Sequence, residues 1–443
     1  MAKSKNKKIM LEDALVPVDE QPYQIPENWC WTFLSNVADW GSGGTPSRKN
    51  PDYYGGYIPW IKTGELEDGY IFDSEEKITE DAVAHSSAKL FPIDSVLIAM
   101  YGATIGKTAI LGIPATTNQA CACARCRDVL NNKYLFYYLR SQKDTFIAKG
   151  KGGAQPNISQ DIIRNHMIPL PPLAEQKRIV EQIESLFSKL DEAKEKAQEV
   201  IDGYEARNAA VYNDAFSGRL TTQWRKDNYK ENKWETKRFD EVADIKSNLV
   251  EPSNYLEFPH IAPDNIEKRT GILLDYHTIA EDGVKSGKHR FYAGQILYSK
   301  IRPYLSKVVM VDFDGLCSAD MYPIEAKENT KYLLYYMLSD MFLEQASSAG
   351  SRSVLPKINQ KELSAIKVRI TSDEEQKEVV RILDYLLPMM QQVRDKAVRV
   401  VDNIDAIKKS ILTKAFRGKL GTNIPEDESA MELLKIILNK GEC

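Results

Sequence analysis

The 443-residue sequence lacks the side-chain clusters with which most enzymes perform chemistry. It has only five histidines, which are scattered, and six cysteines without the spacing of a disulfide framework. We find no G-x-S-x-G, no H-E-x-x-H and no carboxylate–lysine cluster of the kind that nucleases use. The Asn/Asp-Pro-Pro-aromatic signature of adenine methylation and a glycine-rich fingerprint for its methyl donor are also missing. These absences argue against a self-sufficient enzyme.

Long apolar runs are missing as well. No stretch approaches the roughly 20 apolar residues of a membrane-spanning helix, and the basic start MAKSKNKKIM lacks the apolar core of a signal peptide. With 43% hydrophobic and 28% charged residues, the composition predicts a soluble, cytoplasmic protein with no membrane partner. The net charge of −4 excludes a globally basic nucleic-acid coat, although one basic face remains compatible with it. The length predicts two or three domains.

Two short motifs suggest ligand sites that their context disfavours. MYGATIGKT at 100–108 is one residue short of a phosphate-binding loop. We expect instead a strand–turn–strand corner that presents Lys107. Cys121, Cys123 and Cys126 in CACARC lack paired C-x-x-C spacing and accompanying histidines, so buried reduced cysteines on a strand are expected rather than a zinc site.

An internal duplication organises the chain. KYLFYYL at 133–139 returns as KYLLYYM at 331–337, and NISQ at 157–160 returns as KINQ at 357–360. AFSGRL at 215–220 returns as AFRGKL at 415–420. The unit is far longer than the roughly 20–50 residues of a solenoid repeat. The chain is therefore interpreted as one domain plus one helix, present twice.

Each copy contains a long helix with one apolar seam. The apolar residues recur in alternating steps of four and three residues, which is the period of a left-handed coiled coil. Pro388 interrupts the second copy and is expected to kink or restart that helix. Extra apolar residues widen both stripes and suggest a bundle with a partner protein. The residues chosen as the seam for the partner or the second helix are Ile179, Ile183, Leu186, Leu190, Val379, Leu383, Leu386 and Met390.

The predicted fold class is α+β. Two tandem target domains of mixed helix and strand are separated and braced by two long antiparallel coiled-coil helices with pseudo-two-fold symmetry. The predicted boundaries are an N-terminal tail at 1–26, a first globular domain at 27–172, a central helix at 173–217, a linker and second globular domain at 218–372, a distal helix at 373–418 and a C-terminal tail at 419–443. We call the two globular domains head 1 and head 2.

Several stretches together resemble the specificity subunit of type I restriction–modification systems. These are IPENWCWTFLSNVADWGSGGTP, YIPWIKTGEL, VLIAMYGATIGK, QPNISQDIIRNHMIPLPPLAEQKRIVEQI and AFSGRL. The resemblance covers nearly the whole chain, and PLPPLAEQKRIV before a long helix is its most specific part. The second half departs more, because it lacks the WCW entry and the PLPP segment and keeps only the degenerate ITSDEEQKEVV.

The resemblance implies a non-catalytic subunit that recognises double-stranded DNA. Each head would read one half of a split target, and because the heads differ in sequence, the target should be asymmetric. Two methylation subunits would dock on the helices, and restriction subunits would join for cleavage. No cofactor is expected in this chain, while S-adenosylmethionine is expected in the methylation subunits.

Candidate DNA contacts are polar or cationic residues on loops of the two heads. Base reading uses Arg, Lys, Asn, Gln, Ser or Thr, and phosphate contacts position the domain. In KGKGGAQPN the glycines would let the backbone approach phosphate while two lysines neutralise it. The predicted residues are Lys62, Thr63, Tyr101, Lys107, Lys149, Lys151, Gln155 and Asn157 in head 1, and Lys300, Arg302, Tyr304, Lys307, Arg352 and Ser353 in head 2.

Two other functions are compatible with parts of the pattern. A coiled-coil adaptor would join proteins without contacting DNA, and acidic rather than basic concavities on the heads would favour it. A fusion of a methyltransferase with a recognition domain would transfer a methyl group without partners. The missing methyltransferase motifs disfavour the fusion.

Overall fold

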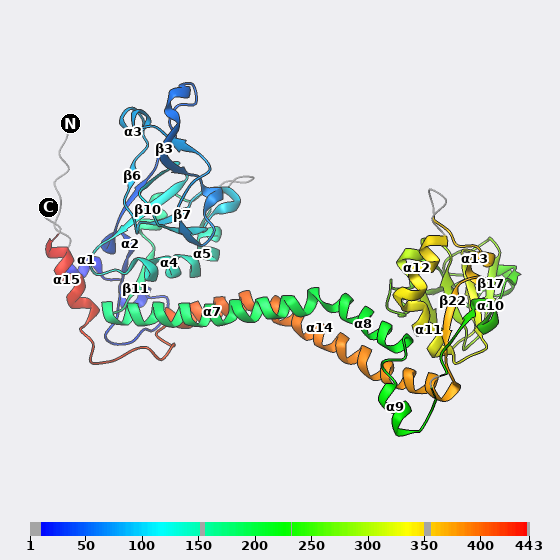
Figure 1. The fold of residues 1–443 in the computed structure, drawn as a ribbon. Coiled ribbons are helices and arrows are strands. Elements are labelled where there is room, and N and C mark those ends of the chain that lie inside the picture. Colours follow the sequence, from blue (N-terminus) through cyan, green and yellow to red (C-terminus); the bar gives the residue numbers. More distant parts are fainter. Residues whose placement is uncertain (1–9, 151–155, 232, 350–355, 441–443) are drawn as a thin grey trace. The chain divides into compact units, whose positions relative to one another are not determined.

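The computed structural model describes residues 10–150, 156–231, 233–349 and 356–440 (Figure 1). The chain divides into two compact units. Unit 1 comprises Met1–Glu195 and Asp402–Cys443, and unit 2 comprises Lys196–Val401. Unit 1 therefore contains head 1, the beginning of the first long helix and the end of the second. Unit 2 contains the remaining helical parts and head 2.

The strands of head 1 form a mixed five-stranded sheet in the order β2-β10-β7-β8-β4, a four-stranded sheet in the order β5-β3-β9-β6, and the antiparallel pair β1-β11. Their bounds are β1 Cys30–Phe33, β2 Ala38–Ser42, β3 Tyr54–Ile61, β4 Gly69–Ile71, β5 Lys77–Ile78, β6 Leu90–Phe91, β7 Val96–Ala99, β8 Thr108–Leu111, β9 Ala115–Thr117, β10 Cys121–Cys126 and β11 Met167–Leu170.

Head 2 repeats this plan with a four-stranded sheet β13-β21-β18-β19, a five-stranded sheet β14-β17-β20-β15-β16 and the pair β12-β22. The bounds are β12 Glu235–Arg238, β13 Ala243–Ile245, β14 Leu249–Val250, β15 Pro259–Ile261, β16 His277–Thr278, β17 Lys288–Phe291, β18 Ile296–Ser299, β19 Val308–Met310, β20 Gly315–Cys317, β21 Met321–Ala326 and β22 Lys367–Ile370.

The helices of unit 1 are α1 Leu11–Ala14, α2 Leu34–Val37, α3 Glu80–His85, α4 Asn132–Ser141, α5 Lys143–Lys149, α6 Gln160–Arg164 and α15 Ala430–Lys440. Those of unit 2 are α8 Tyr204–Phe216, α9 Thr222–Asp227, α10 Phe239–Val242, α11 Thr330–Leu338, α12 Asp340–Ala349 and α13 Gln360–Ser364. The long helices α7 Leu173–Asp202 and α14 Asp373–Ala415 contribute to both units. None of the helices within the described ranges has the length and apolarity needed to cross a membrane.

The central strands of each head are apolar throughout because both of their faces are buried. In β7, Val96 and Ile98 face the core that contains the long helices, whereas Leu97 and Ala99 face a second core within the head. In head 2, Ile296 and Leu297 of β18 divide in the same way. A strand covered on both faces needs no polar alternation, which explains continuous runs such as VLIA.

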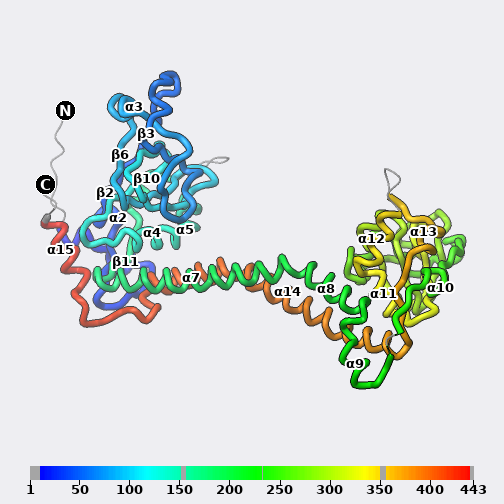
Figure 2. The backbone as a smooth tube through the Cα atoms, viewed as in Figure 1, coloured from blue at the N-terminus to red at the C-terminus, as the bar shows by residue number. Residues whose placement is uncertain are grey.

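The long helices pack against each other in both units, in the antiparallel sense that the duplication predicts. In unit 1, the Lys408 ammonium lies 2.5 Å from Asp191, while the chain beyond α14 reaches the start of α7 (Figure 2). In unit 2, the Tyr204 hydroxyl donates to Gln391 at 2.5 Å. The α+β class with paired long helices is thus confirmed.

Two details of the long helices differ from the expectation of an unbroken first helix and a possible restart in the second. The first long helix is not continuous, because Gly203 separates α7 from α8. Glycine is a poor helix former, which explains the position of this break. The second helix does not restart at Pro388, since α14 runs through it. Pro388 itself is exposed on this helix.

Each head closes around the end of the helix that belongs to the other copy. Phe416, just past α14, makes edge contacts with Tyr134 and Tyr138 of head 1, with ring centroids 5.3 and 5.1 Å apart. Phe216, which ends α8, contacts Tyr332 and Tyr336 of head 2 in the same manner, at 5.3 and 5.0 Å. The Tyr134 and Tyr332 hydroxyls each donate to a backbone carbonyl of β11 or β22, both at 2.7 Å.

A buried glutamate–glutamine pair fixes the beginning of each long helix. Glu175 accepts a hydrogen bond from Thr422 at 2.7 Å, and Gln176 accepts one from the Asn131 backbone N–H at 2.8 Å. The second copy keeps this arrangement, with Thr221 donating to Glu375 at 2.5 Å. The chain beyond one helix is thereby joined to the first turn of the other helix.

The Glu375 carboxylate is 2% exposed and has several donors. Burial by itself would raise the pKa of Glu375, but hydrogen bonds from Thr221, Thr371, Trp234 and Arg225 outweigh burial and hold the pKa below its ordinary value. Because the folded-state pKa is lowered, this carboxylate stabilises the fold fully above its ordinary pKa. The contribution is lost as the pH falls through the lowered value.

We predict that Glu375→Gln lowers the free energy of unfolding of unit 2 by about 3 kcal/mol, because Arg225 loses its buried counterion. The loss should shrink as the pH falls through the lowered pKa of Glu375, where the wild-type carboxylate also becomes protonated. Urea unfolding of the full chain at several pH values, followed by hydrogen exchange in β12 and β22, measures both effects. Glu374→Gln is the matched control, since Glu374 has a 62% exposed side chain. Equal losses in the two variants would contradict the assignment.

We also predict that Phe416→Ala accelerates hydrogen exchange in α4 and β11 of head 1 and leaves α11 and β22 of head 2 unchanged. Removing a buried phenylalanine costs about 3–5 kcal/mol. Phe216→Ala should have the reverse effect, so each variant is the control for the other. Faster exchange in the wrong head would show that the helix ends do not pack as described.

Candidate nucleic-acid interface

The same backbone corner occurs in both heads, between two central strands. In head 1 it is η4 Gly102–Thr104, between β7 and β8. The Gly102 N–H donates to the Pro156 carbonyl at 2.8 Å, and the Ile158 N–H donates to Met100 at 2.9 Å. The segment after residue 155 is thereby attached to the corner. This confirms the strand–turn–strand corner, because no helix follows Lys107 as a phosphate-binding loop requires.

Head 2 reproduces these contacts around η7 Pro303–Leu305, between β18 and β19. The Arg302 N–H donates to the Pro356 carbonyl at 2.8 Å, and the Ile358 N–H donates to Lys300 at 3.0 Å. Two segments that are distant in the sequence therefore form one surface in each head. A rigid scaffold that presents loop side chains in this way is typical of recognition sites.

The corners share their backbone conformation although their residues differ. Gly102 and Gly106 have φ of 63° and 79°, and the equivalent Arg302 and Ser306 have φ of 49° and 45°. Positive φ is easy for glycine and unfavourable for residues with a Cβ. Both copies of the repeat therefore keep the backbone conformation of the corner, while the side chains that it carries differ.

Tyr101 and Asn157 are the predicted residues that the corner of head 1 brings together. They form an antiparallel bridge, and both are exposed, Tyr101 at 45%. Lys107, half-buried, lies on the same corner. Lys149 is exposed at the end of α5, with its ammonium 3.4 Å from His166 Nδ1. Burial, assisted by that ammonium, lowers the pKa of His166 to about 4.

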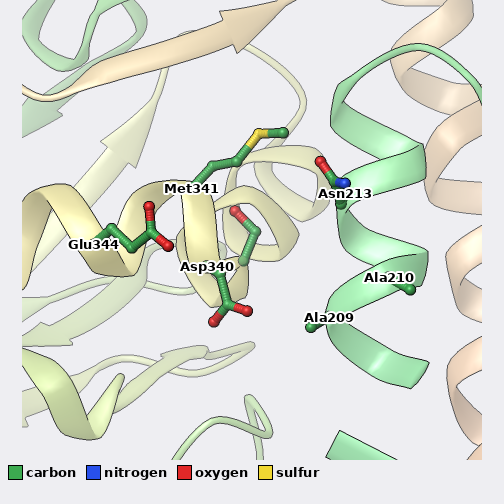
Figure 3. A pocket seen from close by; sticks show the side chains of 7 residues that line it. Ala209, Ala210, Asn213, Asp340, Met341 and Glu344 are labelled. Carbon is green, nitrogen blue, oxygen red and sulfur yellow. The ribbon is translucent and has the colours of Figure 1, made fainter. Parts of the chain in front are cut away.

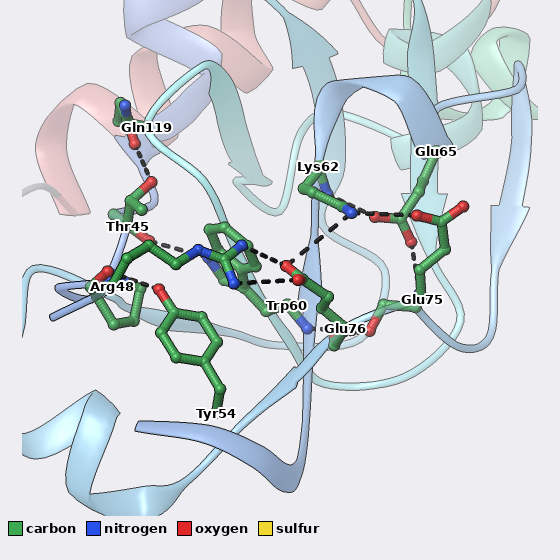
Figure 4. A network of polar contacts seen from close by, with 12 residues as sticks. Thr45, Arg48, Tyr54, Trp60, Lys62, Glu65, Glu75, Glu76 and Gln119 are labelled. Atoms are coloured by element: carbon green, nitrogen blue, oxygen red, sulfur yellow. Dashed lines mark hydrogen bonds and ion pairs between the residues drawn. The ribbon is translucent and has the colours of Figure 1, made fainter. Parts of the chain in front are cut away.

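Lys62 lies in a separate charged network (Figure 4), and Thr63 begins the short 3-10 helix that follows it. Its ammonium is 3.1 Å from Glu75 and 4.0 Å from Glu76. Arg48 also reaches Glu76, at 2.7 Å, and stacks on Tyr54 with 4.2 Å to the ring centroid. The carboxylates neutralise the Lys62 charge, so it is less available to phosphate than the sequence suggested.

The lysines predicted in head 2 are engaged with the protein itself. Lys300 donates to the Ala319 carbonyl at 2.6 Å, and Lys307 donates to the Pro263 carbonyl at 2.7 Å. Tyr304 is 48% exposed, and Arg302 is exposed at the corner. Four predicted residues lie outside the described ranges: Lys151, Gln155, Arg352 and Ser353.

The sequence analysis missed Lys357 and Gln119. Lys357 lies opposite Ile301 on the corner of head 2, and its ammonium is 3.0 Å from Asp320. Its equivalence to Asn157 in the repeat was the signal that could have identified it. Gln119 accepts a hydrogen bond from Thr45 (Figure 4), a contact between distant segments that no local pattern encodes.

The residues chosen as the helix seam differ in burial. Those nearest each head are fully buried, and those farther along are half-buried. The first group is Ile179, Ile183, Val379 and Leu383, and the second is Leu186, Leu190, Leu386 and Met390. The head cores thus cover the first turns of each seam, whereas the later turns have fewer neighbours.

A cavity of about 410 Å³ lies in unit 2 between α8 and α12 (Figure 3). Ala209, Ala210 and Asn213 line one side, and Asp340 and Glu344 lie on the other. The two carboxylates would repel phosphate, so we do not include this cavity in the nucleic-acid interface.

Two of the three β10 cysteines follow the prediction of buried thiols, and Cys126 at the end of the strand is half-buried. Cys121 and Cys123 are at most 1% exposed, and burial raises the pKa of the Cys121 thiol to about 12. Such a thiol is neither a metal ligand nor a nucleophile near neutral pH. Within the described part of the chain, no His, Cys, Asp and Glu side chains gather into a possible metal site.

Comparisons with known proteins show which family the two repeated domains resemble. The family model for the type I restriction modification DNA specificity domain matches residues 26–201 and 231–395. The EcoDI specificity subunit from Escherichia coli, a type I restriction enzyme subunit, is 38% identical over 314 residues, which cover 66% of this chain and 71% of that protein. The MjaIX specificity subunit from Methanocaldococcus jannaschii is 26% identical over 433 residues, which cover 90% and 94%.

Solved structures agree on the fold. The HsdS subunit from Thermoanaerobacter tengcongensis has a TM-score of 0.68 at 20% identity, over 91% of this chain and 100% of that one. A second solved chain, described under the structural basis of complex assembly and conformational transition of the type I R-M system, has a TM-score of 0.62 at 20% identity. The match covers 90% of this chain and 100% of that one. The chain therefore belongs to the type I restriction–modification DNA specificity family, as a non-catalytic subunit that recognises DNA.

Proposed function

We propose that the two heads read the two parts of a split, asymmetric sequence in double-stranded DNA. The observation that carries the proposal is the corner, which has one backbone conformation in both heads but different side chains. A common backbone presents different donors and acceptors at equivalent places. Base edges are distinguished by such donors and acceptors, so two corners of unequal chemistry would select two unequal half-sites.

The chemistry of the corners supports DNA over the adaptor alternative. Head 1 presents a phenol and an amide at Tyr101 and Asn157, and head 2 presents a cation at Arg302 beside Lys357, whose ammonium lies 3.0 Å from Asp320. Exposed groups of these kinds match phosphates and base edges. Acidic concavities on the heads would favour an adaptor, and the cavity beside Asp340 and Glu344 lies against α8 rather than at a corner.

We further propose that the chain acts in an assembly with DNA, two methylation subunits and restriction subunits. Part of α14 supports a protein partner, because Tyr385, Met389 and Val393 are 64%, 40% and 49% exposed. Their spacing of four residues places them along one side of the helix. S-adenosylmethionine would be bound by the methylation subunits. The assembly would act in the cytoplasm.

The proposal predicts a bipartite methylated motif whose halves can be altered separately. In the full chain assembled with its methylation subunits, Tyr101→Ala combined with Asn157→Ala should relax only one half of the motif. Sequencing of methylated adenines across a genome that carries the assembly measures this. Tyr57→Ala is the control, because this 70% exposed tyrosine lies on β3, outside the corner.

An unsplit motif, or equal relaxation of both halves, would contradict the proposed reading by two heads. Binding should also weaken steeply with salt, because phosphate contacts release counterions. Binding of the wild-type assembly that does not depend on salt or on sequence would favour the adaptor.

A further inference from the structure

Arg302 occupies a backbone conformation that suits its residue type poorly. Its φ and ψ are 49° and 63°, in the left-handed region. Few residues with a Cβ adopt this region, and long side chains are uncommon there. Such residues persist where the surrounding structure enforces them, and they gather at functional sites.

The first repeat shows that the fold does not need an arginine at this place. Gly102 meets the same demand with φ of 63°, in the same corner and with the same backbone hydrogen bond. A Cβ built on Gly102 meets no atom of the described chain within 4 Å, so a side chain there extends into open space. Arginine in head 2 is therefore explained by what its side chain does beyond the fold.

Among the described cations of this corner, Arg302 is the one that the protein leaves available. Lys300, Lys307 and Lys357 each hold their ammonium against a carbonyl or a carboxylate. The Arg302 side chain is exposed and has no hydrogen bond or ion pair with the residues that the structure describes. Its backbone is fixed by the N–H bond to Pro356 and by the Leu305 N–H, which donates to its carbonyl at 2.9 Å.

We infer that Arg302 is a specificity-determining residue of head 2 and that it recognises a guanine in the major groove. The guanidinium has paired donors that match the O6 and N7 acceptors of guanine. A fixed backbone reduces the conformational freedom lost on binding, which favours discrimination. The inference rests on the proposed function. Because Gly102 has no side chain, head 1 makes no equivalent contact.

The test uses the full chain assembled with methylation subunits and a DNA library randomised across the target. Wild type should prefer guanine at one position of one half-site by roughly ten- to hundredfold. Arg302→Gly should abolish the preference at that position alone, and its melting temperature should equal or exceed that of wild type, because glycine suits the backbone. Loss of preference without loss of stability separates recognition from folding.

Two further variants distinguish base reading from other roles. Arg302→Lys keeps the charge but not the planar paired donors, so it should weaken the guanine preference without abolishing it and keep the salt dependence of binding. Ser306→Gly is the matched control, because it relaxes the other left-handed residue of the corner, which is 2% exposed. It should leave the sequence preference unchanged.

An unchanged motif in Arg302→Gly would overturn the inference and leave the proposed function intact. Uniformly weaker binding, with no change at any single base, would also overturn it and would assign Arg302 to phosphate. A wild-type assembly without sequence preference would instead refute the proposed function. Gly102→Arg offers a converse test, since it should add a base preference to the other half-site.

Discussion

The buried carboxylate at the start of each long helix is the interaction on which the remaining structure depends. Glu175 and Glu375 are almost completely removed from solvent, and each accepts a hydrogen bond from a threonine that follows the other helix. A buried charge without such donors would be strongly destabilising. The contact therefore requires the second helix to end where the first begins, and this requirement builds unit 1 from two distant parts of the chain.

This arrangement separates the constant parts of the duplication from the variable ones. The base of each head keeps the glutamate–glutamine pair, the tyrosines and the phenylalanine of the opposite helix. The corners keep only their backbone conformation. Packing tolerates little change in volume, whereas exposed loop side chains can change without loss of the core. Recognition can thus diverge between the heads while the scaffold stays the same.

The sequence predicts the scaffold well because its signals are local and repeated. The seam spacing indicated the long helices, and the recurrence of AFSGRL as AFRGKL indicated equivalent helix ends. The seam pattern did not predict the helix break at Gly203, which follows from the low helix propensity of glycine, or the passage of α14 through Pro388. The site was harder to predict. In the sequence, Lys62 and Lys307 cannot be distinguished from free surface lysines. Only the folded chain shows the carboxylates and carbonyls that engage them.

Photo-crosslinking of the complete assembly to its DNA target tests the central claim most directly. A photoreactive residue would replace either Tyr101 or Tyr304, the exposed tyrosines of the two corners. The account predicts that each position crosslinks to bases of a different half of the target. Crosslinks from both positions to the same half, or crosslinks to protein alone, would contradict it.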